Sequence, residues 1–118
     1  MPKKILIVED DEGTRGFLST LLERTGYDVV ATNSVQEGRS LLEEGNPDLL
    51  ITDIRLGAFN GLQLLAMSPR RIPAIVTTGY PDTVLEAEAR QAGAKFLLKP
   101  IEPSVLLKLL SELLGGPP

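Results

Sequence analysis

Residues 49–53 read Leu-Leu-Ile-Thr-Asp, a short apolar run that ends on a carboxylate. Such a run predicts a strand buried on both faces, here Asp48 to Thr52, as in a parallel sheet covered by helices. Three further apolar runs also end on polar residues. They are Ile5–Val8 before Glu9 and Asp10, Ala74–Thr77 before Thr78, and Phe96–Leu98 before Lys99. The carboxyl ends of parallel strands lie at one edge of a sheet, where ligands bind in open α/β folds.

Strand-like and helix-like segments alternate along the whole chain. This alternation predicts an α/β fold in which helices cover both faces of a parallel sheet. The predicted strands cover approximately residues 4–8, 28–32, 48–52, 74–77 and 95–98. The predicted helices cover approximately residues 12–25, 35–44, 61–67, 81–91 and 102–114. Capping residues, glycines and prolines at the segment ends support these boundaries.

The composition excludes several kinds of site. The 118 residues suffice for one domain with a single core, and they include no cysteine and no histidine. Disulfides, thiolate metal sites, an imidazole base and a phosphohistidine within this chain are therefore excluded.

Twelve basic and 16 acidic residues give a net charge of -4 without a basic stripe, so we expect no nucleic-acid binding. No apolar run approaches the ~20 residues of a membrane span, and a cytoplasmic location is expected by default.

Carboxylates at positions 9, 10 and 53 form the first candidate site. Carboxylates gathered at one sheet edge repel one another, and a bound cation relieves that repulsion. Oxygen ligands without histidine or cysteine favour a hard ion such as Mg2+ over zinc. An alternative is that the acidic run Glu9-Asp10-Asp11 only caps and stabilises the N-terminus of the next helix. For this run alone, that interpretation is the better one. Asp53 favours the metal site, because a carboxylate ending a buried strand is costly without a partner.

Thr78 and Lys99 follow the two strands predicted at residues 74–77 and 95–98. At the ends of adjacent strands, a hydroxyl and an ammonium can each hold one oxygen of a phosphoryl group. Taken singly, Thr78 is better explained by a hydroxyl bonded to the backbone. Lys99 can equally form an ion pair with Asp53, which is compatible with phosphoryl binding.

The ordered set of motifs resembles the receiver domain of bacterial two-component response regulators. Each motif alone is weak, but together they stand at strand ends with suitable spacing over the whole chain. They are Val8-Glu9-Asp10-Asp11, Thr52-Asp53-Ile54-Arg55-Leu56, Asn60-Gly61-Leu62, Thr77-Thr78-Gly79-Tyr80, Gly93-Ala94 and Lys99-Pro100. The resemblance implies a doubly wound, flavodoxin-like three-layer sandwich with strand order 2-1-3-4-5. Residues 1–118 would form a single receiver domain, in which residues 115–118 are a tail or the start of a linker.

The resemblance also implies roles for the acidic residues. Asp53 would be the phosphoacceptor, which takes a phosphoryl group from a phosphohistidine on a sensor histidine kinase or phosphotransfer protein. Asp10, Asp53 and the main-chain carbonyl of Arg55 would ligate Mg2+ or Mn2+ directly, and Glu9 would act through water. Such a protein catalyses only its own phosphorylation and dephosphorylation, and is otherwise not an enzyme.

Residues near the ends of the last two strands complete the implied site. Thr78 and Lys99 would hold the phosphoryl oxygens. Phe96 would be an aromatic switch that turns inward as Thr78 moves towards the phosphate, and the Lys99–Pro100 bond would be cis. The resulting conformational change would be the signal.

The chain departs from the usual pattern of this family at several positions. Glu9 stands where aspartate is commoner, and Gly57 stands where proline is frequent. The segment 66–72 is shorter than usual, which indicates a clipped third helix. The switch at Phe96 would work by packing alone, because phenylalanine has no hydroxyl.

The last predicted helix is apolar over an arc wider than one core-facing stripe requires. Its apolar residues are Val105, Leu106, Leu107, Leu109, Leu110, Leu113 and Leu114. In the family that the chain resembles, the fourth helix, the fifth strand and the fifth helix form the usual partner face. We expect a homodimer or an output domain to bind there. An equal alternative is that the outer leucines cover another part of the same protein.

Three other functions stay open at this point. An aspartate-nucleophile phosphatase of the haloacid dehalogenase class also places an aspartate after a strand, but it needs a second acid where Arg55 stands. A flavin- or nucleotide-binding module would need a phosphate-cradling loop after the first strand, where the acidic residues 9–12 would repel phosphate. The third is a receiver that works without phosphorylation, although all the key groups are present.

Overall fold

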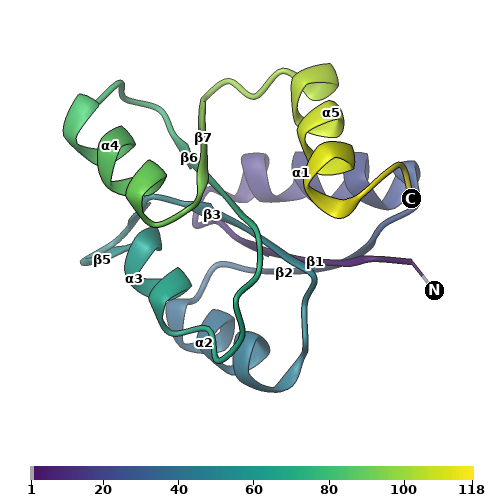
Figure 1. The fold of residues 1–118 in the computed structure, drawn as a ribbon, viewed down its shortest axis with the longest axis horizontal. Helices are drawn as coiled ribbons and strands as arrows, with labels where there is room; N and C mark the ends of the chain where they lie inside the picture. The colour runs from purple at the N-terminus through teal and green to yellow at the C-terminus, as the bar shows by residue number, and fades with distance from the viewer. Residues whose placement is uncertain (1) are drawn as a thin grey trace.

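The computed structural model describes residues 2–118. Within these residues, five parallel strands form a sheet in the order β2-β1-β3-β6-β7 (Figure 1). The strands are β1 Lys4–Val8, β2 Asp28–Thr32, β3 Leu49–Asp53, β6 Ala74–Thr78 and β7 Lys95–Leu98. Because β6 and β7 are the fourth and fifth strands of this sheet along the chain, the predicted order 2-1-3-4-5 is confirmed.

Helices cover both faces of the sheet. They are α1 Glu12–Thr25, α2 Val35–Glu44, α3 Gly61–Ala66, α4 Thr83–Gln91 and α5 Pro103–Leu114. Helices α1 and α5 lie on one face, whereas α2, α3 and α4 lie on the other (Figure 1). The doubly wound three-layer architecture is therefore confirmed. None of the helices in residues 2–118 combines the length and the apolar character needed to cross a membrane.

One apolar layer joins the sheet to α1 and α5. It follows from the alternation of side chains along a strand, which sends Ile5 and Ile7 of β1 to this face. Leu18 of α1 and Leu106 of α5 pack in the same cluster, and all four side chains are almost completely buried. These contacts anchor the middle of α1, a helix that begins directly after the acidic loop.

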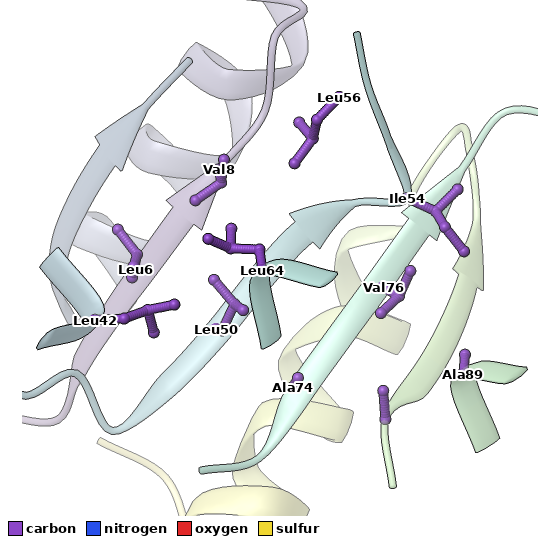
Figure 2. Packing of buried hydrophobic residues seen from close by; sticks show 11 residues of the cluster. Leu6, Val8, Leu42, Leu50, Ile54, Leu56, Leu64, Ala74, Val76 and Ala89 are labelled. Carbon is purple, nitrogen blue, oxygen red and sulfur yellow. The ribbon is translucent and has the colours of Figure 1, made fainter. Parts of the chain in front are cut away.

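The second layer lies on the opposite face, between the sheet and α2, α3 and α4 (Figure 2). The alternate residues of β1, Leu6 and Val8, point into it and meet Leu42 of α2 and Leu64 of α3. Helix α4 contributes less, since Ala89 is its buried residue. This agrees with the thinly apolar sequence of α4.

A short hairpin follows β3, where the sequence indicated only a loop. Strands β4 (Arg55–Leu56) and β5 (Phe59–Asn60) pair antiparallel across a two-residue turn. Gly57 begins that turn with φ +59°, a conformation that proline cannot adopt because its ring fixes φ near about -65°. Glycine in place of the family's frequent proline therefore permits the hairpin.

Several predicted boundaries are wrong by one residue. Strand β3 runs from Leu49 to Asp53 instead of Asp48 to Thr52. The Asp48 carboxylate accepts a hydrogen bond from the Lys4 main-chain N–H at 2.7 Å, while Asp53 pairs in register with Thr77. In the same way β6 extends to Thr78, which pairs with Leu98 of β7. Helix α3 ends at Ala66, one residue earlier than predicted, with Met67 as its C-terminal cap.

Candidate functional site

Three carboxylates converge at the carboxyl edge of the sheet. Glu9 and Asp10 follow β1, and Asp53 is the last residue of the adjacent strand β3. One carboxylate oxygen from each residue lies within 4.8 Å of the others. Glu9 and Asp53 are buried, with 2% and 8% of their surface exposed, whereas Asp10 is exposed. The cluster is therefore open to solvent on the Asp10 side.

Lys99 is the cation at this cluster. Its Nζ donates to Glu9 Oε1 at 2.5 Å and to Asp53 Oδ2 at 3.1 Å. Lys99 directly follows β7, and the peptide bond between Lys99 and Pro100 is cis. One ammonium group thus bridges two buried carboxylates, one directly after β1 and the other at the end of β3.

The backbone around Asp53 is closely packed. Asp53 Oδ1 accepts a hydrogen bond from the Arg55 N–H at 3.1 Å, and the Asp53 carbonyl accepts one from Thr52 Oγ1 at 3.0 Å. Gly61, the first residue of α3, lies directly against that carbonyl. A methyl group at Gly61 would come within 2.4 Å of the Asp53 oxygen. The position of Asp53 therefore depends on a glycine at residue 61.

A main-chain hydrogen bond connects Thr78 to Lys99. It ends β6, between β3 and β7, and its carbonyl accepts a hydrogen bond from the Lys99 N–H at 2.7 Å. Its hydroxyl is buried and accepts a hydrogen bond from the Tyr80 N–H at 3.3 Å. The Thr78 hydroxyl is therefore bonded to the backbone, as expected for Thr78 taken singly. It nevertheless lies at the same sheet edge as Lys99.

Phe96 and the Arg55 side chain lie outside the carboxylate cluster. Phe96 pairs with Val76, two positions before the ends of β6 and β7, and packs half-buried against the layer beneath α4. The Arg55 guanidinium lies over the ring of Tyr80, 5.6 Å from its centroid. This stacked pair joins β4 to the loop that follows β6.

Burial perturbs the Glu9 carboxylate. Loss of water raises the pKa of Glu9 from its ordinary 4.5 to about 7, against the lowering effect of its hydrogen bond to Lys99. Burial also acts to lower the pKa of Lys99, but the hydrogen bonds and charges of Glu9 and Asp53 outweigh it and raise the pKa. Burial therefore disfavours the charged form of Glu9, whereas the two carboxylates favour the charged form of Lys99.

Glu9 supplies independent evidence that the cluster can hold a cation. Its Oε2 is buried and has no hydrogen-bond partner among the described residues. A buried, unpartnered carboxylate oxygen is costly, and it offers a free ligand atom beside Asp10 and Asp53. The donor set is all oxygen, which suits a hard divalent ion.

Two contributions to this site were not identified from the sequence. Gly61 was noted only as part of a motif, and its contact with Asp53 requires the fold. Arg15, in α1, donates from Nη1 to the main-chain carbonyl of Glu9 at 2.9 Å. Arg15 is six residues from Glu9 in the sequence, and no sequence pattern indicates a contact over that separation. The only signal for it was an arginine shortly after an acidic loop.

The raised pKa of Glu9 predicts how stability depends on pH in the metal-free protein. Folded Glu9 keeps its proton up to about pH 7, whereas unfolded Glu9 releases it near 4.5. Between these values the native state binds more protons, so the free energy of unfolding falls as pH rises through this window. Urea unfolding with a chelator present, from pH 5 to pH 8, measures this slope. In Glu9→Gln the slope is expected to be shallower, and an equal slope in both proteins contradicts the assignment.

Comparisons with known proteins agree with this geometry. The family model described as response regulator receiver domain matches residues 5–111. The polar-differentiation response regulator DivK of Brucella anthropi is 31% identical over 121 residues, covering 98% of each chain. A CheY-like receiver domain protein from Methanospirillum hungatei superposes with a TM-score of 0.90 at 31% identity, over 98% of this chain and 95% of that one. Vibrio cholerae CheY4 shares the fold, with a TM-score of 0.87 at 24% identity over 96% and 99% of the two chains.

Proposed function

The chain belongs to the response regulator receiver domain family, and from this premise we propose that it receives a phosphoryl group on Asp53 in a Mg2+-dependent reaction. The donor would be a phosphohistidine on a sensor histidine kinase or phosphotransfer protein. We assign residues 1–118 to a single receiver domain, with residues 115–118 as a tail or linker start, and we propose that it acts in the cytoplasm. Its role would be signalling, without turnover of an external substrate.

One observation carries this proposal: within residues 2–118, three carboxylates and the ammonium group of Lys99 meet at the carboxyl edge of the sheet. Asp53 is held between two donors, the Arg55 N–H and Lys99 Nζ. Its carboxylate is therefore oriented while one side of the cluster stays open at Asp10. Phosphoryl transfer needs this kind of positioning and charge neutralisation more than covalent help from the protein.

The transfer itself needs only one nucleophile from this chain. An Asp53 carboxylate oxygen attacks phosphorus, the bond from phosphorus to the imidazole nitrogen of the donor breaks, and the imidazole keeps the electron pair. An acyl phosphate forms on Asp53. Lys99 neutralises charge on the phosphoryl oxygens, and the Thr78 hydroxyl donates to one of them.

Asp10, Asp53 and the Arg55 carbonyl would hold Mg2+ or Mn2+ directly, with Glu9 acting through water. The bound ion would neutralise charge on the incoming phosphoryl group. The free Oε2 of buried Glu9 supports this assignment.

Conformational signalling would pass through Thr78 and Phe96. Movement of the Thr78 hydroxyl from the Tyr80 N–H towards the phosphoryl group would open space that half-buried Phe96 can occupy. Phe96 also lines a groove of about 760 Å³ between α4, β7 and α5. Val105, which is 49% exposed, lines it too. This groove supports the proposal that a second copy or an output domain binds the α4/β7/α5 face.

Incubation with acetyl phosphate tests the function without knowledge of the natural kinase. With Mg2+, intact mass spectrometry is expected to show one added phosphoryl group per chain. With a chelator in place of Mg2+, the modified fraction is expected to fall at least about tenfold, because the acidic cluster then lacks its neutralising charge. An unmodified protein in the presence of Mg2+ would overturn the proposal.

A further inference from the structure

Arg15 fixes the backbone of the acidic loop from the side of α1. Its Nη1 donates to the Glu9 carbonyl at 2.9 Å, and the side chain is half-buried. On its other side, the Glu9 N–H donates to the carbonyl of Thr32 in β2 at 3.0 Å. Both main-chain polar groups of Glu9 are therefore held, one by the sheet and the other by Arg15.

The held carbonyl belongs to the peptide bond between Glu9 and Asp10. A peptide group is planar, so the direction of its carbonyl also determines the direction of the Asp10 N–H. Two of the three carboxylates in the cluster, those of Glu9 and Asp10, project from the residues on either side of this plane. A rotation of this plane that is carried into the following residue would move the Asp10 carboxylate relative to the carboxylates of Glu9 and Asp53.

Arg15 makes this contact in a strongly acidic neighbourhood. Residues 9–12 are all acidic. The ion pairs within the described part of the chain nevertheless do not include Arg15, whose hydrogen bond goes to a carbonyl. Arg15 thus orients the loop while leaving its carboxylate oxygens available to a cation.

We propose that Arg15 is a positioning residue for the metal site, acting through the Glu9 carbonyl to hold Glu9 and Asp10 in their ligating arrangement. This inference rests on the proposed Mg2+-dependent function. The hydrogen bond from Arg15 to the Glu9 carbonyl resembles the hydrogen bonds by which residues around a metal site orient the metal ligands in other proteins.

The sign of the effect separates positioning from simple charge. If Arg15 acted only as a nearby positive charge, its removal would strengthen Mg2+ binding, because one repulsive interaction would be lost. If Arg15 positions the loop, its removal weakens binding, by about tenfold or more for a contact of this kind. The two effects have opposite directions, so one binding constant distinguishes them.

Isothermal titration of the full chain with MgCl2 makes this measurement. Arg15→Met keeps the aliphatic stem and removes the guanidinium, and we expect its Mg2+ affinity to be about tenfold below wild type. Arg24→Met is the matched control, since it removes the same charge from the exposed last turn of the same helix. Its affinity is expected to stay within about twofold of wild type, because charges more than a Debye length apart are screened. Arg15→Gln is titrated alongside and decides the outcome if Arg15→Met does not fold.

Each outcome has a defined meaning. Wild-type binding with a loss confined to the Arg15 variants supports the inference. Equal or tighter binding by the Arg15 variants, or an equal loss in Arg24→Met, overturns it and leaves the proposed function standing. Failure of wild type to bind Mg2+ overturns the metal-dependent function and this inference together.

Discussion

Asp53→Asn is expected to abolish phosphoryl transfer from acetyl phosphate completely. The side-chain amide has nearly the shape of the carboxylate but is not a nucleophile towards phosphorus, so no acyl phosphate can form at this position. Intact mass spectrometry in the presence of Mg2+ measures the modified fraction. The variant is expected to stay unmodified under conditions that modify the wild-type chain.

The fold is expected to survive this substitution. Lys99 keeps its hydrogen bond to Glu9 Oε1 when the Asp53 charge is removed, so its half-buried ammonium group still has a partner. Circular dichroism should therefore show the wild-type helix content. An Asp53→Asn protein that folds and is modified as fully as wild type would refute the role of Asp53.

Asp11→Asn is the matched control. Asp11 is exposed, lies outside the carboxylate cluster, and caps α1 by accepting from the Thr14 N–H at 2.8 Å. Asparagine caps helices about as well as aspartate, so the helix is retained. This variant is expected to be modified to the wild-type extent. A loss of modification equal to that in Asp53→Asn would show that the reaction depends on the total negative charge near the site and not on Asp53 specifically.

Gly61→Ala is expected to have the largest effect on stability. Its new methyl carbon would lie 2.4 Å from the Asp53 carbonyl and 2.9 Å from the Thr52 side chain, closer than van der Waals contact allows. The nearest atom belongs to the backbone, so it cannot move aside by a rotamer change. Overpacking of this kind costs about 3 kcal/mol in the free energy of unfolding. Urea denaturation measures the cost, and unchanged stability would contradict the packing described here.

Gly16→Ala provides the opposite control. Gly16 lies within α1, and a methyl group there would meet no atom within 4 Å. The substitution is expected to raise the free energy of unfolding by about 0.5–1 kcal/mol, because alanine loses less conformational freedom than glycine in a helix. The pair of alanine variants therefore separates a close contact with Asp53 from the general effect of glycine replacement.

The alternation of apolar runs and amphipathic segments was sufficient to predict a parallel sheet with helices on both faces, whereas the strand order came from the resemblance to receiver domains. Residues 49–53 are apolar up to Asp53 because both faces of β3 are covered, by α1 and α5 on one side and by α2, α3 and α4 on the other. Such a pattern is a direct consequence of burial, so it can be recognised in the sequence without any knowledge of tertiary contacts. The convergence of Glu9, Asp10 and Asp53 followed from the same reasoning, since parallel strands end at a common edge.

Details that depend on contacts between distant segments could not be predicted in this way. The β4–β5 hairpin contains two residues in each strand, too few for any periodicity to appear. The close approach of Gly61 to Asp53 depends on how α3 enters the sheet edge. The Arg15 bond to a carbonyl involves no pattern of side chains at all, and the unpartnered Glu9 Oε2 is a property of the packed site.

The most direct test of the central claim is to locate the phosphoryl group after reaction with acetyl phosphate and Mg2+. Borohydride reduces an acyl phosphate on aspartate to homoserine, which tandem mass spectrometry of peptides can place in the sequence. We predict homoserine at position 53 in the wild-type chain, with residues 9–11 unchanged. Homoserine at position 10 or 11, or a modified chain with intact Asp53, would contradict the assignment of Asp53 as the phosphoacceptor.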